Sequence, residues 1–182
     1  MTITTASTLR DVVQVVARAL RAAGIRAVLT GGASASVHSD GDYLSHDLDF
    51  ILESRVTQKQ LDRVMAVAGF TRDGDRFVHP QTAFFVEFPR GPLAIGDDDL
   101  VQPVDVRVGT TPVLMLSATD SCRDRLAAFY HWNDRQSLET AVKIGRRRRV
   151  DLSAIRRWSE KEGQTQRFLE FRRRLARSSA RV

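Results

Sequence analysis

The chain has 182 residues, of which 42% are hydrophobic and 27% charged, proportions that fit one globular domain with a sizeable core. Its single cysteine, Cys122, excludes an internal disulfide and a cysteine-based zinc cluster, and it fits a reducing cytoplasm. The N-terminus lacks an apolar signal core, and no run approaches about 18 apolar residues, so we expect neither export nor a membrane span.

Charge is distributed unevenly along the chain. Residues 143–182 contain fourteen Lys and Arg residues against four acids, a net charge of +10. Because the whole chain carries +6, residues 1–142 sum to −4. A basic end on a mildly acidic body indicates a polyanionic partner such as nucleic acid. The alternative is an arginine-rich helical face that contacts only solvent.

The first part of the chain alternates between helical and strand-like periodicity. We expect, in chain order, a helix over 5–23 capped by Ser7 or Thr8, a strand over 25–30, a short helix over 33–37, a strand over 46–53, a helix over 57–68, a hairpin of 70–72 and 76–79, and a strand over 83–88. The segment 89–103 is rich in Pro, Gly and Asp, which predicts a loop with a short strand at 93–95. A further strand is expected over 102–108.

Beyond Ser117 the pattern is helical throughout. We expect helices over 118–131, after a cap at Asp134, after Asp151, and over 166–177, with the last five residues frayed. This order divides the chain into a mixed part, 1–116, and a helical part, 117–182, which is basic from about residue 143.

Two carboxylates mark the strand expected at 46–53. Asp47 and Asp49 alternate with Leu48 and Phe50, so the two acids lie on one face of the strand and the two apolar residues on the other. At a rise of about 3.3 Å per residue their backbones are roughly 7 Å apart, so both side chains can converge on a divalent ion or an ion pair. The alternative is a solvated strand end.

A Gly-Gly turn precedes this strand. Gly31 and Gly32 open the short helix, where free backbone N–H groups and the helix dipole favour a phosphate, and Ser34 can add a hydroxyl. The alternative is a plain tight turn. A third metal ligand is also expected, and Glu87 is the first candidate as the lone acid of an apolar strand, with Asp105 in reserve.

These residues carry a resemblance to a known family. Gly31-Gly32-Ala33-Ser34 followed by Ser45-His46-Asp47-Leu48-Asp49-Phe50 resembles the signature of the polymerase-β-type nucleotidyltransferase superfamily. The segment DSCRDRLAA, residues 120–128, is similar to a helix of its AbiEii/MenT-like toxin branch. The resemblance covers roughly residues 10–145 and has two departures. Position 125 is Arg where that branch usually has Lys, and the third acid is Glu rather than Asp if Glu87 fills that role.

The resemblance implies a fold and a chemistry. The fold would be α+β, a nucleotidyltransferase-like mixed β-sheet flanked by helices, with a helical C-terminal part. The activity would be transfer of a nucleotidyl group from an NTP, dependent on Mg²⁺ or Mn²⁺, with the metal held by Asp47, Asp49 and Glu87. The residues expected to hold the nucleotide are Gly31, Gly32, Ser34, Asp124 and Arg125.

In the toxin branch the acceptor is the 3′ end of tRNA, and the basic end of this chain suits RNA. The expected RNA contacts are Arg146, Arg147, Arg148 and Arg149. The resemblance therefore implies a cytoplasmic toxin of a bacterial toxin–antitoxin pair, with an antitoxin protein as a further partner and no membrane. Two alternatives stay open: nucleotidylation (AMPylation) of a protein hydroxyl, and a catalytically silent RNA- or protein-binding module on the same scaffold. Modification of a small molecule, as with aminoglycosides, also fits the motif but leaves the basic end unexplained.

Overall fold

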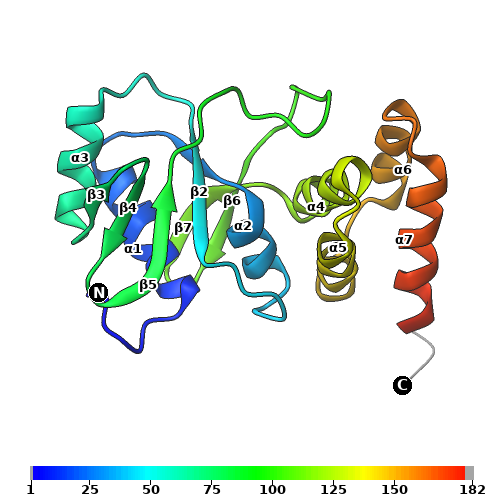
Figure 1. Cartoon of the computed structure of the whole chain (residues 1–182), viewed down its shortest axis with the longest axis horizontal. Helices are drawn as coiled ribbons and strands as arrows, with labels where there is room; N and C mark the ends of the chain where they lie inside the picture. Colours follow the sequence, from blue (N-terminus) through cyan, green and yellow to red (C-terminus); the bar gives the residue numbers. More distant parts are fainter. Residues whose placement is uncertain (1, 179–182) are drawn as a thin grey trace.

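The computed structural model describes residues 2–178, which form a seven-stranded mixed sheet with helices around it (Figure 1). The helices are α1 (Leu9–Ala22), α2 (Gly31–His38), α3 (Gln58–Val67), α4 (Ala118–Trp132), α5 (Arg135–Arg147), α6 (Leu152–Lys161) and α7 (Thr165–Ser178). The strands are β1 (Ala27–Leu29), β2 (Asp47–Leu52), β3 (Thr71–Asp73), β4 (Arg76–His79), β5 (Thr82–Glu87), β6 (Val104–Val108) and β7 (Thr111–Met115). This architecture confirms the expected α+β fold class.

The strand order across the sheet is β3-β4-β5-β2-β1-β7-β6. The central strand β2 runs antiparallel to β1 and parallel to β5. The parallel pairing aligns Asp47 with Phe85, Leu48 with Val86, and Asp49 with Glu87. Because aligned residues of neighbouring strands point to the same face, this register decides which β5 side chains accompany the β2 acids.

Two hydrophobic clusters hold the elements together. The first lies against one face of the sheet and includes residues of α1, α3 and the central strands, among them Leu48 and Phe50. The second joins α4, α5, α6 and α7 around Leu126, Ile144 and Phe171. Helix α2 contributes to both clusters, so it connects the sheet to the helical part, which extends away from the sheet as far as α6 and α7 (Figure 1).

The first helix shows how the local pattern sets an element. The Thr8 hydroxyl accepts the backbone N–H of Asp11, and the Asp11 side chain accepts the N–H of Thr8 in return, a capping box that fixes the helix start. The start expected at Thr5 is therefore too early. Leu9, Val12, Val13, Val16 and Leu20 recur at helical spacing, and all of them are buried.

The structure differs from the sequence expectation at two other places. No strand was expected over 109–116, yet β7 lies there and pairs between β1 and β6. The sequence pattern of β7 is weak because Pro112 has no N–H to donate to a strand ladder. The prediction of a strand at 93–95 is wrong, because Ile95 forms only an isolated bridge with Asp98. The Pro- and Gly-rich chain around it provides no extended run for a ladder.

Two further expectations concern the ends and the division of the chain. The division at residue 116/117 stays a prediction, and α2 and α4 pack against one another across it. Of the five residues expected to fray, 179–182 lie outside the described residues. Among the helices of the described chain, none is both long and apolar enough to cross a membrane.

Candidate functional site

A row of carboxylates lies on one face of the sheet at β2 and β5. Leu48 and Phe50 are fully buried in the core and fix the orientation of β2, so Asp47 and Asp49 project from the opposite face. The β2–β5 register places Glu87 beside Asp49 on that face. The structure thus brings together the three acids that the sequence singled out. Their roles as metal ligands stay a prediction.

The reserve candidate Asp105 lies elsewhere. It belongs to the edge strand β6, which β1 and β7 separate from β2. Its carboxylate faces the guanidinium of Arg21, at 3.5 Å between Nη1 and Oδ1. Asp105 is therefore not part of the carboxylate row, and it offers a matched acidic control outside the site.

Three ionised carboxylates in this row repel one another, and burial of Asp49 adds to the cost of its charge. The pKa of Asp49 is raised from 3.8 to about 6, first by burial and then by the negative charges of Asp47, Glu87 and Asp124, with Arg125 opposing them. Burial and like charge both favour the neutral acid. A bound cation would relieve this repulsion, which is why such clusters are typical of metal sites.

Ser45 fixes the direction of one member of the row. Its side chain is buried, and its hydroxyl donates a hydrogen bond to Oδ1 of Asp47. The sequence signal for this contact is the serine two positions before the first acid, which belongs to the motif quoted above. Ser45 is therefore a positioning residue for Asp47.

The Gly-Gly turn packs directly against the carboxylate strand. Gly31 has φ of +59°, and a Cβ atom built on it would lie 2.5 Å from Oδ2 of Asp49. A Cβ on Gly32 would overlap the hydroxyl of Ser45. A side chain at either position would displace the side chain of Asp49 or of Ser45, and the positive φ at Gly31 favours glycine there in addition. This contact brings the amino end of α2 to the carboxylate row.

The amino end of α2 has no side-chain cap. The N-cap residue is Thr30, whose hydroxyl makes no capping hydrogen bond and whose backbone N–H donates to the carbonyl oxygen of Asp49 at 2.9 Å. The N–H groups of the first helical turn are therefore left without a side-chain acceptor. Together with the helix dipole they form a site that favours an anion.

A cavity of about 290 Å³ opens between the carboxylate strand, the start of α2 and helix α4. It is lined by Thr30, Gly31, Asp49, Ile51, Pro89, Pro92, Leu93, Ala94, Leu116, Asp124 and Arg125. The sequence prediction that Gly31, Asp124 and Arg125 share one cleft with Asp49 therefore agrees with their positions. The binding of a nucleotide by these residues stays a prediction.

Arg125 supplies a positive charge to this cavity. Burial alone would lower its pKa, but the charge of Asp124 and a hydrogen bond to Asp124 Oδ2, 2.6 Å from Nη2, raise the pKa above its ordinary value. The guanidinium therefore stays protonated at physiological pH. Its charge is offset by Asp124, but a guanidinium has five N–H donors, and those that do not bond Asp124 suit phosphate oxygens beside the helix amino end.

Ser34 does not line the cavity. It is fully buried in α2, and its hydroxyl donates to the hydroxyl of Ser121 on α4, at 3.3 Å. Its expected contact with the triphosphate is thus replaced, in this structure, by a contact between the two helices. Gly32 faces Ser45 and Tyr43 instead of the cavity and contributes through its backbone position.

The loop over 92–98, which precedes β6, forms one wall of the cavity. No role was expected for this loop from the sequence. Pro92, Leu93 and Ala94 line the cavity, while Ile95 is buried in the second cluster. The N–H of Asp97 donates to Oε1 of Glu162 at 2.9 Å. The signal in the sequence was Ile95, an apolar residue within a polar loop.

A buried arginine fastens the same loop to α4. Arg123 is 8% exposed, and its guanidinium pairs with Asp98 of the loop and with Asp120 at 2.8 Å. The guanidinium also lies over the ring of Trp158, 5.1 Å from the ring centre. The helical part of the chain therefore holds one wall of the cavity in place.

The donor set of the row suits a hard divalent cation, because all three side chains end in carboxylate oxygens. Within residues 2–178, however, no three His, Cys, Asp or Glu side chains converge closely enough to hold an ion as they stand. A side-chain rotation would be needed for all three acids to share one ion. The expected Mg²⁺ or Mn²⁺ stays a prediction.

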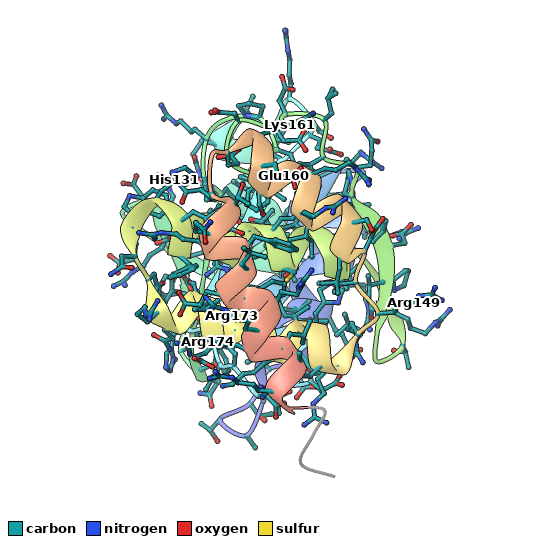
Figure 2. All side chains as sticks on the ribbon, turned by 90° about the vertical axis from the view of Figure 1, so that its right-hand side faces the viewer. His131, Arg149, Glu160, Lys161, Arg173 and Arg174 are labelled. Carbon is teal, nitrogen blue, oxygen red and sulfur yellow. The ribbon has the colours of Figure 1, made fainter. Side chains whose placement is uncertain are left out.

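The four arginines expected to contact RNA are not equivalent. Arg147 pairs with Asp42 at 2.9 Å, Arg148 pairs with Asp40, and Arg146 donates to a backbone carbonyl of α7. Arg149 has neither an ion pair nor a hydrogen bond within the described part of the chain, and it projects from the edge of the helical face in Figure 2. Two of the four charges are thus neutralised by the loop after α2.

Comparison with known proteins gives a match at the level of structure. No protein-family model matches the sequence, and no curated protein matches it. A crystal structure of an antigenic nucleotidyltransferase-like protein from Paracoccidioides brasiliensis is similar over 78% of this chain and 77% of that chain, with a TM-score of 0.57 and 16% identity. The solution structure of the antibiotic-resistance factor ANT(2'')-Ia is similar over 85% of this chain and 95% of that chain, with a TM-score of 0.49 and 13% identity. The first of these two similarities shows that the chain has a nucleotidyltransferase-like α+β fold.

Proposed function

We propose that this protein is a divalent-metal-dependent nucleotidyltransferase that transfers a nucleotidyl group from an NTP to a hydroxyl of RNA, the tRNA 3′ end being the expected acceptor. The observation that supports this most strongly is the approach of the uncapped amino end of α2 to a row of three carboxylates on β2 and β5. An anion-binding element beside a cation-binding element is what a metal–triphosphate substrate requires.

Each part of the site has a task in this reaction. The first-turn N–H groups of α2 and the guanidinium of Arg125 bind phosphate oxygens. Asp47, Asp49 and Glu87 would hold Mg²⁺ or Mn²⁺, which when bound supplies positive charge for the phosphates and lowers the pKa of the attacking hydroxyl. Ser45 orients Asp47, and Pro92, Leu93 and Ala94 form one wall of the cavity.

The acceptor and the cellular role are the finer parts of the proposal. The basic charge of residues 143–182 supports a polyanionic acceptor. Among the described residues, Arg147 and Arg148 pair with acids, whereas Arg146 and Arg149 have no acidic partner. The role of a toxin with an antitoxin partner is supported by the motif resemblance alone. Induced expression should then arrest growth, and the Asp49→Asn variant should relieve that arrest.

The direct test is incubation of the protein with each labelled NTP, Mg²⁺ and tRNA. We expect label on the RNA with wild type, and its loss in Asp47→Asn, Asp49→Asn and Glu87→Gln. Asp105→Asn is the matched control, because that acid lies on the same sheet outside the row, and it should keep the activity. No label on any RNA, or full activity in the Asp47 and Asp49 variants, would overturn the proposal.

Two other outcomes identify the alternatives. Label appearing on protein instead of RNA would indicate nucleotidylation of a protein hydroxyl. Salt-dependent RNA binding without any label transfer would indicate a silent binding module. The observation that favours the silent module is that the three carboxylates do not converge on one point in the described structure.

A further inference from the structure

Trp132, the last residue of α4, is the most exposed tryptophan that the described chain offers. Its exposed fraction is 78%, whereas the second tryptophan, Trp158, is 5% exposed and packed in the second hydrophobic cluster. A large aromatic ring that the protein leaves in water contributes little to folding. Such a ring is available to stack on a flat partner.

The geometry of α4 places Trp132 in line with the cavity. Trp132 follows Arg125 by seven residues, which is within about 20° of two full turns, so both side chains leave the same side of the helix. At 1.5 Å per residue the two positions are about 10.5 Å apart along the helix axis. Arg125 lines the cavity beside Asp49, so Trp132 lies beyond its cationic end.

The loop that walls the cavity reaches the same end of α4 by an independent route. Leu93 and Ala94 line the cavity, and three residues later the N–H of Asp97 donates to Oε1 of Glu162. Oε2 of Glu162 lies 3.1 Å from Nε2 of His131, the neighbour of Trp132. Figure 2 shows His131 beside the end of α6 that precedes Glu162. Glu162 therefore holds both the loop that walls the cavity and the end of α4.

We propose that Trp132 stacks on the base of the NTP whose phosphates bind at Arg125 and the amino end of α2. This inference rests on the proposed function and adds the position of the base. An NTP is anionic at one end and has a flat aromatic base at the other. The site has a corresponding order: the guanidinium of Arg125 and the first-turn N–H groups of α2 at the cavity, then the ring of Trp132 about 10.5 Å further along α4. That ring makes an edge contact with His131 and is still 78% exposed. Stacking tolerates every base, so little preference among the four NTPs is expected from this contact.

The chain offers a direct readout, because its two tryptophans differ so strongly in exposure. We expect titration with ATP, GTP, CTP or UTP in the presence of Mg²⁺ to quench the fluorescence of wild type. The quench should persist in Trp158→Phe and disappear in Trp132→Leu. Calorimetry should show the Kd for NTP weakened on the order of tenfold in Trp132→Leu and nearly unchanged in Trp132→Phe, since leucine removes the π face and phenylalanine keeps it.

The outcomes separate this inference from the proposed function. If wild type binds NTP but Trp132→Leu binds it equally well, the stacking contact is refuted and the proposed function stands. If wild type binds no NTP and transfers no label, the proposed function itself fails. If the fluorescence of wild type is quenched only when RNA is added, Trp132 contacts the RNA acceptor. That result would also refute the proposal that Trp132 stacks on the base of the NTP.

Discussion

Replacing Asp49 by asparagine should stabilise the folded protein at neutral and alkaline pH while abolishing nucleotidyl transfer. Asparagine has nearly the same shape as aspartate but no charge, so it removes the repulsion from Asp47, Glu87 and Asp124 and the cost of burying an ion. Active-site groups are often held against such a cost, because function needs them charged.

The magnitude follows from the raised pKa. A shift from 3.8 to about 6 corresponds to roughly 3 kcal/mol of unfavourable free energy for the ionised Asp49 in the folded state. Because Asp49 is only partly buried and asparagine is still polar, we expect a gain of about 1 to 3 kcal/mol in the free energy of unfolding. For a chain of this length that is a rise in Tm of several degrees.

The dependence on pH has a definite sign. The folded state holds the proton of Asp49 up to about pH 6, whereas the unfolded chain releases it near pH 3.8. The stability of wild type attributable to this group is therefore highest below the unfolded pKa, falls as the pH rises through the folded pKa, and then levels off. The variant lacks this fall, so the difference in Tm should open between about pH 4 and pH 6.

The assay is thermal unfolding of wild type and Asp49→Asn followed by circular dichroism at pH 4, 6 and 8. A variant that is less stable than wild type at pH 8, or a difference that is the same at all three values, would refute the electrostatic reasoning. Repeating the pH 8 scan with Mg²⁺ tests the cation: we expect a rise in Tm for wild type and none for the variant.

Three further predictions follow from single positions. In Gly31→Ala the new Cβ would meet the side chain of Asp49. We therefore expect the free energy of unfolding of the purified variant to fall by more than the roughly 1 kcal/mol that backbone strain alone would cost. We also expect the purified variant to lose NTP binding. Arg149→Ala should weaken RNA binding in a filter assay more than Arg148→Ala, because Arg148 is already paired within the chain. Cys122 is fully buried and burial raises its pKa, so a thiol reagent should label it only after unfolding.

Each of these has its own control. Gly24→Ala has a similarly positive φ of +69° but meets no atom within 4 Å, so it isolates the backbone strain from the clash; equal effects of the two glycine variants would contradict the explanation. For the arginines, equal losses of RNA affinity would mean that ion pairing within the chain does not matter. Labelling of Cys122 in the native protein at the unfolded rate would show that α4 opens readily.

Several features of the site follow from short stretches of sequence. The common face of Asp47 and Asp49 is a consequence of the alternation within one strand, and the caps of α1 and α4 depend on residues three positions apart. In both cases neighbours along the chain determine the geometry, so the local pattern was sufficient. Arg125 was assigned to the cleft by the resemblance of residues 120–128 to a family motif instead.

Other features depend on contacts between distant residues. Glu87 joins the row only because β5 pairs in parallel with β2 in one particular register. Arg147 and Arg148 meet Asp42 and Asp40 across more than a hundred residues, which changed the expected RNA surface. The loop over 92–98 has no periodic pattern at all, and its position is set by its contacts with α4 and α6.

The amino-acid sequence alone is sufficient to identify a pair of carboxylates on one strand, a glycine turn before it, and a basic end. Only the folded chain shows which distant groups join them: Glu87 lies beside Asp49, and Ser34 contacts α4. The physical reason is that periodicity and capping depend on backbone geometry over a few residues. Strand register and interhelical contacts are set instead by the free energy of packing the whole chain.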